Sequence, residues 1–235
     1  MALTDQQRGI TADASSYLTN YGAFQGSEPR GVVIHSLECG AIPGIAAQLS
    51  SRGGWLDGEG LAPTLMTDPT SIVRAIPDGD SGGHIGGPGN SRYLGVEVSG
   101  RAAWTRAQWL DGGPAQAALE HQARAVAGLF VLYGRPFTDI RWLSIAQLRA
   151  GTPFGMCFHA DISISGVSGT DHWDPGLGYP GGYVLAAVQR WFLSMTGGKP
   201  VPPPGYREKA LFNRQPRQRR VLIDKGKFQQ TDVRA

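Results

Sequence analysis

Histidine is scarce in this 235-residue chain, so each of the five can be weighed singly. His35 closes an apolar run at 32–35, and His159 closes another at 156–159. Runs of this kind form buried strands, and side chains at strand ends beside glycine-rich loops can build a site on a rigid sheet. Together with Asp174, the two histidines are a common catalytic zinc set that leaves the fourth tetrahedral position to water. Zinc makes a hydroxide nucleophile available near neutral pH, so the expected chemistry is hydrolysis.

These residues also have ordinary structural interpretations. A lone histidine at a strand end is more often a hydrogen-bonded surface residue than a metal ligand. Asp161 and Asp171 are rival carboxylate ligands. The Pro-Gly turn that follows Asp174 favours Asp174 as the ligand. His121 lies on the expected polar side of a helix, and we assign it to solvent without a function.

Glu97 is the single acid in an otherwise apolar run at 93–98. Burial raises the pKa of a carboxyl group on such a strand, which suits a residue that must accept a proton and return it. The alternative is an acid at the edge of a strand that faces water. Two further histidines, His84 and His172, lie in glycine-rich segments at 79–90 and 166–182.

Four segments form a recognisable series along the chain. They are Val-Val-Ile-His at 32–35, Gly-Val-Glu-Val at 95–98, Phe-His-Ala-Asp at 158–161 and His-Trp-Asp-Pro-Gly at 172–176. In these segments and their order, the chain resembles the type 2 zinc amidases of the bacteriophage lysozyme and peptidoglycan recognition protein type. The resemblance spans most of residues 30–192, and its glycine- and tryptophan-rich style is most like lysins of phages that infect actinobacteria. It implies hydrolysis of the amide bond between N-acetylmuramic acid and L-alanine in peptidoglycan.

The resemblance also implies roles for single residues. It makes His35, His159 and Asp174 the ligands of one Zn²⁺ ion, and Glu97 the catalytic acid on the central strand. The loop between His159 and Asp174 is longer than in compact members of the family, so Asp171 is the alternative ligand. A noncatalytic peptidoglycan-binding module of the same fold is a second hypothesis. The presence of all three ligand candidates and Glu97 argues against it.

Three residues are expected to act beside the metal. His172 stands where the family often has a lysine that supports the tetrahedral oxyanion, a role that an imidazolium can also fill. His84 matches a loop histidine that lines the substrate groove of the family. Trp173 is the tryptophan expected to face a sugar or a peptide stem. Neither Cys39 nor Cys157 occupies the position of the cysteine ligand found in some relatives, and we expect both to be reduced and buried.

Strands and helices alternate in the pattern of an α/β domain. Strands are expected at 31–36, 93–98 and 156–159, with a hairpin at 63–67 and 71–76. Helices are expected at 5–21, 43–52, 114–133, 145–150 and 183–195. The glycine-rich segments are expected to be loops. We therefore predict an N-terminal helix and lead-in at 1–29, and an amidase domain at 30–196 with a central mixed sheet flanked by helices.

The charge of the chain is unevenly distributed. Residues 1–196 hold 12 arginines, no lysine and 16 acidic residues, a net charge of −4, whereas residues 197–235 have a net charge of +7. This tail begins with a stiff proline-rich linker at 200–204. One hypothesis places the tail against other proteins of a virion tail, where the amidase would open the wall at entry. The alternative is a basic extension that docks on its own domain or on anionic wall polymers.

Nucleic acid and membrane are not expected partners. No nucleic-acid-binding fold accompanies the basic cluster at 217–220. No run reaches the roughly 18 apolar residues that a membrane span needs, and the N-terminus lacks the pattern of a signal peptide. A lysin of this kind would be made in the host cytoplasm and act at the cell wall; the alternative location is the virion tail.

Overall fold

A six-stranded mixed sheet lies at the centre of the larger of two units, Met1–Pro200 and Val201–Ala235. The structure is a computed structural model and describes residues 3–18, 20–24, 28–52, 54–198, 220–224 and 227–231. The strands follow one another across the sheet in the order β1 (Ala12–Asp13), β5 (Ile72–Arg74), β4 (Leu65–Thr67), β7 (Leu94–Val98), β3 (Val32–Ser36) and β8 (Met156–Phe158). Neighbours from β4 to β8 are parallel, whereas β5 runs antiparallel to β4. The predicted α/β class with a mixed sheet is confirmed.

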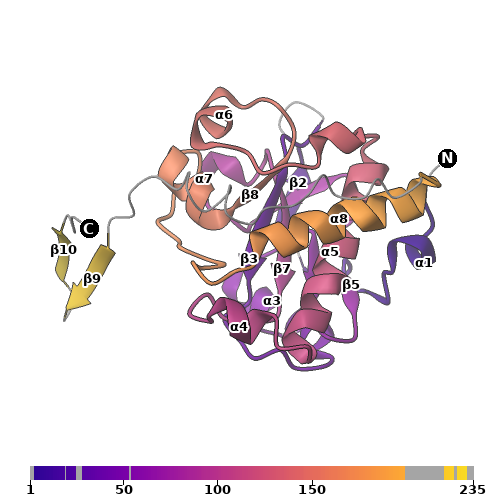
Figure 1. Cartoon of the computed structure of the whole chain (residues 1–235), viewed down its shortest axis with the longest axis horizontal. Helices are drawn as coiled ribbons and strands as arrows, with labels where there is room; N and C mark the ends of the chain where they lie inside the picture. Colours follow the sequence, from indigo (N-terminus) through magenta and orange to yellow (C-terminus); the bar gives the residue numbers. More distant parts are fainter. Residues whose placement is uncertain are drawn as a thin grey trace. The chain divides into compact units, whose positions relative to one another are not determined.

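Alternate residues of the central strands enter different cores, because successive side chains of a strand point to opposite faces. Positions 94, 96 and 98 of β7 and positions 32 and 34 of β3 pack in one core with α5 (Pro114–Leu132) and α8 (Gly181–Thr196). Figure 1 shows these two helices packed together over one face of the sheet. Gly95, Glu97 and His35 fall between the core positions, so they lie on the opposite face.

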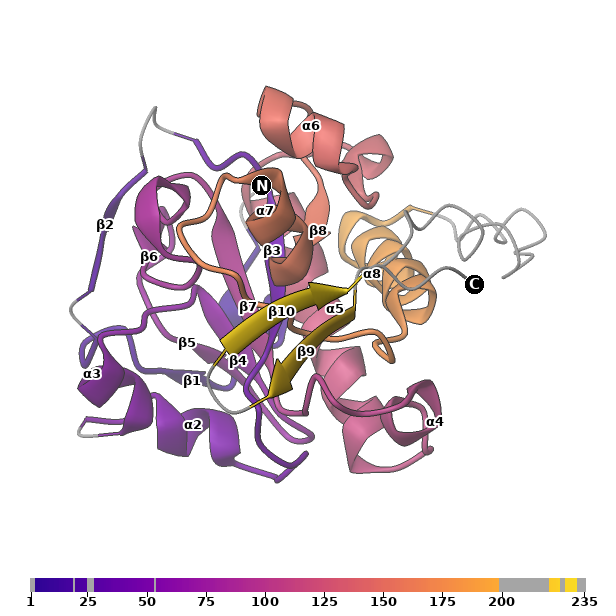
Figure 2. The same cartoon turned by 90° about the vertical axis from the view of Figure 1, so that its left-hand side faces the viewer.

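The opposite face is covered by shorter elements, which Figure 2 shows from the side. Helix α2 (Ile45–Leu49) contacts β4 and β5, and its core also includes Leu56 of α3 (Trp55–Glu59). Helices α6 (Ile145–Ala150) and α7 (His159–Ser165) share a third core with Val33 and Cys157. The remaining elements are α1 (Asp5–Arg8), β2 (Tyr21–Ala23), β6 (Asp80–Gly82), α4 (Arg106–Trp109) and the 3₁₀ turns η1 (Gly87–Gly89) and η2 (Phe137–Asp139). None of the helices in the described ranges is long and apolar enough to cross a membrane.

The expected helix at 5–21 is wrong beyond its first turn. Thr4 and Gln7 form the predicted capping box, but α1 ends at Arg8 because Gly9 adopts a left-handed φ of 80° that caps the helix. The chain then follows the edge of the sheet, where Thr11 N–H donates to the carbonyl of Ile72 at 2.8 Å. Tertiary pairing with β5 therefore overrides the local helical signal.

Two further expectations need correction. Residues 79–90 are not entirely a loop, because β6 pairs antiparallel with β2. His121 does not simply face solvent: it is half-buried, and its Nδ1 lies 2.8 Å from the carbonyl oxygen of Asp68. The helix at 114–133, the hairpin formed by β4 and β5, and the helix at 145–150 are confirmed.

Asp68, in the turn between β4 and β5, is fully buried and accepts four hydrogen bonds. Its donors are Ala46 N–H, Thr70 N–H and the hydroxyls of Thr70 and Ser71, at 2.6–3.0 Å. Burial alone would raise the pKa of Asp68, but these hydrogen bonds hold the pKa below its usual value. The carboxylate therefore stabilises the fold above its unfolded pKa of about 4, and this stabilisation is lost as the pH falls through the lower folded pKa.

Asp68→Asn is expected to lower the free energy of unfolding by about 1–3 kcal/mol at pH 7, because an amide NH₂ would face buried donors. The exposed Glu59→Gln at the end of α3 provides the control, with an unchanged unfolding midpoint. Denaturant titration at pH 7 measures both variants. Equal stability of Asp68→Asn and wild type would show that these hydrogen bonds do not support the fold.

The second unit contains an antiparallel hairpin of β9 (Arg220–Asp224) and β10 (Lys227–Thr231). The proline-rich linker at 200–204 and most of the basic cluster at 217–220 lie outside the described residues. The expected contact of residues 197–235 with other virion tail proteins therefore stays a hypothesis.

Candidate metal centre

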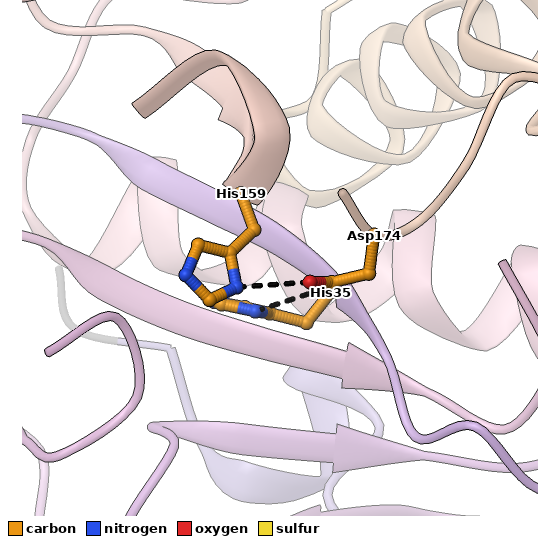
Figure 3. Close-up of side chains that lie close together, drawn as sticks. All are labelled: His35, His159 and Asp174. Atoms are coloured by element: carbon orange, nitrogen blue, oxygen red, sulfur yellow. Dashed lines mark hydrogen bonds and ion pairs between the residues drawn. The ribbon is translucent and has the colours of Figure 1, made fainter. Parts of the chain in front are cut away.

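The candidate ligands converge because β3, β7 and β8 are parallel, and the carboxyl ends of parallel strands meet at one edge of a sheet. His35 is the fourth residue of β3 and pairs in register with Glu97 on β7. His159 follows β8 directly and begins α7. Asp174 comes from the segment between α7 and α8, where its carbonyl accepts a hydrogen bond from Ala160 N–H at 3.1 Å. Figure 3 shows the two imidazoles converging on the Asp174 carboxylate.

His35, His159 and Asp174 form a buried group that can hold a metal ion. One ligand atom from each residue lies within 4.8 Å of the other two. Nδ1 of His35 lies 3.2 Å from Oδ2 of Asp174, and Nδ1 of His159 lies 3.0 Å from Oδ1. All three side chains are less than 12% exposed. Two rival carboxylates lie outside the group: Asp161 accepts from Phe158 N–H at 3.4 Å, and Asp171 is exposed.

The donor set and its spacing fit zinc. Two imidazole nitrogens and one carboxylate are a common set of protein ligands in catalytic zinc sites. Ligands about 2.0–2.2 Å from one tetrahedral ion lie about 3.3 Å from each other, close to the separations between the Nδ1 atoms and the Asp174 oxygens. The residues present therefore fit the group that the sequence suggested.

Burial and charge act on the ionisation of this group. Burial alone would raise the pKa of Asp174, but close contacts with the His159 and His35 rings outweigh it and hold the pKa well below its usual range. Burial lowers the pKa of His35, although the Asp174 carboxylate opposes that effect. A carboxylate that stays ionised beside His35, whose neutral form burial favours, has the charge state that a divalent cation requires.

Glu97 presents a second buried carboxyl group beside the metal ligands. Its Oε1 lies 3.9 Å from Nδ1 of His35, and its Oε2 is buried with no hydrogen-bond partner among the described residues. Burial, followed by the negative charges of Asp174 and Glu38, raises the pKa of Glu97 well above its ordinary value. A carboxyl group with a raised pKa holds a proton more readily than an ordinary one, which suits a group that takes up a proton and returns it.

His172 and Trp173 lie at the exposed side of the site. The imidazole of His172 is 57% exposed and stacks on that of His159, with ring centroids 4.5 Å apart and an interplanar angle of 11°. Nδ1 of His172 lies 3.8 Å from Oδ1 of Asp174. Trp173 is 60% exposed. Both side chains are therefore accessible to a ligand that approaches the metal group.

His84 lies beneath the site and is only 7% exposed. Its Nδ1 is 3.0 Å from Nε2 of His35, and its Nε2 is 2.9 Å from the carbonyl oxygen of Tyr93. Its ring packs over Gly95 of β7, where an added Cβ would lie 2.6 Å from Cγ of His84. Burial and the nearby His35 lower the pKa of His84 to about 3, so its imidazole is neutral at pH 7.

Three residues around the site were not found from the sequence. The Thr170 hydroxyl lies 3.2 Å from Nε2 of His159, and the Asn90 side-chain oxygen accepts three consecutive backbone N–H groups at 84–86. Glu38, with a left-handed φ of 53°, accepts hydrogen bonds from the Ser36 hydroxyl and Ala102 N–H. The position of Asn90 at the end of a glycine-rich loop is a signal that could have found it, because asparagine side chains commonly organise loop backbones.

Both cysteines are free, as expected. Cys157 is buried, whereas Cys39 is only half-buried, which differs from the expectation. Neither belongs to the metal group.

Solved structures place this chain in a known fold. A Staphylococcus aureus hydrolase, AmiA, solved in complex with its ligand, has 19% sequence identity over 86% of this chain and 89% of its own, with a TM-score of 0.58. The two chains share a fold. A mutant endolysin from Bacillus subtilis matches with 14% identity over 76% of this chain and 99% of its own, at a TM-score of 0.49. The endolysin N-acetylmuramoyl-L-alanine amidase LysCS from Clostridium intestinale matches with 14% identity over 81% of this chain and 98% of its own, at a TM-score of 0.42. Neither the protein-family models nor the curated proteins give a match.

Proposed function

We propose that this chain is a zinc-dependent amidase that hydrolyses the bond between N-acetylmuramic acid and L-alanine in bacterial peptidoglycan. The observation that carries the proposal is the buried group of His35, His159 and Asp174 beside the buried carboxyl group of Glu97. The fold shared with AmiA, a hydrolase, supports a hydrolytic site at this edge of the sheet. The four sequence segments that resemble the type 2 amidases supply the identity of the bond.

The proposed mechanism assigns the metal to His35, His159 and Asp174. A zinc ion bound there would polarise the scissile carbonyl and make a hydroxide nucleophile available at neutral pH. Glu97 takes up the proton of the attacking water at a carboxyl oxygen and then delivers it to the nitrogen of the leaving L-alanine. Its raised pKa suits both transfers, since the group must be basic enough to accept a proton and acidic enough to return it.

His172 and Trp173 are proposed to act on the substrate from the exposed side of the site. As an imidazolium, His172 would donate a hydrogen bond to the oxyanion that develops on the scissile carbonyl. The exposed indole of Trp173 offers an apolar face on which a sugar ring or a peptide stem can pack. The sequence also proposed a place in the substrate groove for His84; its burial leaves little surface for such a contact.

The resemblance to lysins of actinobacterial phages favours lysis of the cell wall after synthesis in the host cytoplasm. An amidase carried in a virion tail for entry is the alternative. Either setting has peptidoglycan as the partner of the site.

Mass spectrometry of digested peptidoglycan tests the activity. The purified chain is expected to release stem peptides that begin with free L-alanine and to leave glycan strands with unsubstituted N-acetylmuramic acid. A zinc chelator is expected to abolish release, and added Zn²⁺ to restore it. Products cut within the glycan, or within the peptide stem, would contradict the proposal. Binding to peptidoglycan without any release would identify a noncatalytic binding module.

A further inference from the structure

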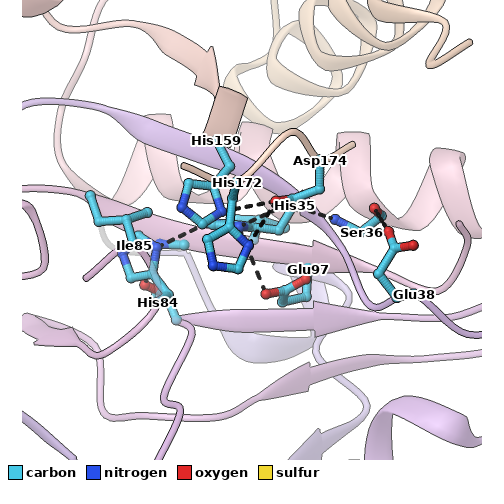
Figure 4. A network of polar contacts seen from close by, with 12 residues as sticks. His35, Ser36, Glu38, His84, Ile85, Glu97, His159, His172 and Asp174 are labelled. Atoms are coloured by element: carbon cyan, nitrogen blue, oxygen red, sulfur yellow. Dashed lines mark hydrogen bonds and ion pairs between the residues drawn. The ribbon is translucent and has the colours of Figure 1, made fainter. Parts of the chain in front are cut away.

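Each histidine of the metal group is hydrogen-bonded at the nitrogen that points away from Asp174. Nδ1 of both rings faces the carboxylate, whereas Nε2 of each ring meets a separate partner, His84 for His35 and Thr170 for His159. In Figure 4, His84 and Ile85 lie on one side of the imidazoles, and Asp174 lies on the other. These outer partners decide where the ring protons reside, because a neutral imidazole carries one proton on one of its two nitrogens.

His35, His84 and the carbonyl group of Tyr93 form a chain of hydrogen bonds, and the proton positions in it follow from the Tyr93 end. A carbonyl oxygen only accepts hydrogen bonds, so Nε2–H of His84 donates to Tyr93 at 2.9 Å. An imidazole with its one proton on Nε2 has a lone pair at Nδ1, so the buried His84 ring accepts a hydrogen bond there. The donor at 3.0 Å is therefore Nε2–H of His35. With that proton on Nε2, the lone pair of Nδ1 is the one that His35 can offer to a metal ion.

His159, Thr170 and the carbonyl group of Ile85 form a second chain of hydrogen bonds, in which a hydroxyl takes the place of the second imidazole. The Thr170 hydroxyl has one hydrogen, which it donates to the carbonyl of Ile85 at 3.1 Å. Its oxygen then accepts from Nε2–H of His159 at 3.2 Å. With that proton on Nε2, His159 can offer the lone pair of Nδ1 to a metal ion, on the side where Oδ1 of Asp174 lies 3.0 Å away.

Both chains end on carbonyl groups of one loop, at Ile85 and Tyr93, and this loop is itself held in shape. The Asn90 side-chain oxygen accepts the N–H groups of His84, Ile85 and Gly86 at 2.8–3.0 Å. Gly95 leaves the space that the His84 ring fills, since any Cβ there would overlap the ring. One loop thus controls the orientation of both ligand imidazoles.

We propose that His84 and Thr170 are positioning residues that fix both ligand histidines in the Nε2–H tautomer, so that a metal ion is bound through Nδ1 of each. The inference rests on the proposed metal site but not on the identity of the substrate. When both rings carry their proton on Nε2, the two Nδ1 lone pairs and the Asp174 carboxylate, 3.0–3.2 Å apart, are ligands that one cation can bind together. This gives His84 a role beneath the metal group in place of the substrate groove.

Metal affinity of the full chain, measured with Zn²⁺ against a competing chelator, tests the inference without any substrate. Thr170→Val removes the hydroxyl at nearly constant volume, and Thr170→Ser retains it as the matched control. We expect the valine variant to bind Zn²⁺ about 10–100-fold more weakly than wild type, the cost typical of a lost outer partner, and the serine variant to bind within about threefold of it. His84→Phe is expected to weaken binding in the same range, because it keeps a ring but removes the acceptor.

Nitrogen-15 NMR of histidine-labelled, zinc-loaded protein reads the tautomers directly. His35 and His159 are expected to show a metal-bound Nδ1 and a protonated Nε2 in wild type and in Thr170→Ser. Coordination through Nε2, or a Thr170→Val variant that binds Zn²⁺ as tightly as wild type, would overturn the inference. If the wild type binds no Zn²⁺, this inference and the proposed function both fail. If it binds Zn²⁺ but releases no L-alanine peptide, only the proposed function fails.

Discussion

Glu97→Gln is expected to reduce amide hydrolysis by about 10²–10⁴-fold, the range typical of a lost general acid–base group. Glutamine keeps the size of the side chain but can neither accept the proton of the attacking water nor return one to the leaving nitrogen. Zn²⁺ binding is expected to persist, because Glu97 lies outside the group of His35, His159 and Asp174. The change thus separates proton transfer from metal binding.

The same variant is expected to be more stable than wild type when both are free of metal. Burial raises the pKa of Glu97 in the folded state, so the ionised form costs stability. This cost is absent below the unfolded pKa of about 4.3 and grows as the pH rises towards the folded pKa. The unfolding midpoints of Glu97→Gln and wild type should therefore coincide near pH 4 and diverge in favour of the variant as the pH rises above that value.

Three measurements decide the outcome for Glu97. Peptide release from purified peptidoglycan gives the activity, chelator competition gives the metal affinity, and thermal unfolding across the pH range gives the stability. The exposed Glu59→Gln serves as the matched control and is expected to behave as wild type in all three. Unchanged peptide release by Glu97→Gln would remove this residue from the mechanism.

Asp174→Asn is expected to abolish activity by preventing metal binding. The carboxylate is the one anion of the metal group, and both Nδ1 atoms of the histidines face it. An amide offers one neutral oxygen and places an NH₂ group in a site built for a cation. The Zn²⁺ affinity should fall by more than the factor of about 10–100 that is typical when a residue hydrogen-bonded to a metal ligand is lost.

The natural control for Asp174 is Asp171→Asn, the alternative ligand suggested by the sequence. Asp171 is exposed and lies outside the metal group, so its amide variant should bind Zn²⁺ and release peptides as wild type does. Metal content by atomic spectroscopy, together with chelator competition, distinguishes the two. Loss of zinc in Asp171→Asn with retention in Asp174→Asn would reverse the assignment.

Local signals predicted the elements that carry the site. The apolar runs at 32–35 and 93–98 form β3 and β7, and the proline and helical spacing at 114–133 locate α5. The first helix was overestimated because the pairing of residues 11–14 with β5 is a contact between distant segments. Such contacts leave no trace in a local pattern.

The candidate ligands and Glu97 were easier to identify from the sequence than the residues that hydrogen-bond to the ligands. His35, Glu97 and His159 stand at strand ends, where their types and positions are visible in the sequence. Thr170 acts through a hydrogen bond to Ile85, 85 residues away, and a threonine in a glycine-rich loop looks like any other loop residue. The function of such a residue is defined by its partners, which only the folded chain brings together.

The place of β3 in the sheet has a consequence for biosynthesis. This early strand lies between β7 and β8, which are made much later, and the last ligand, Asp174, follows them. A ribosome must therefore translate most of the larger unit before the centre of the sheet can close. Nascent chains that stop short of Asp174 lack one ligand, so a partly made product cannot carry the assembled metal group.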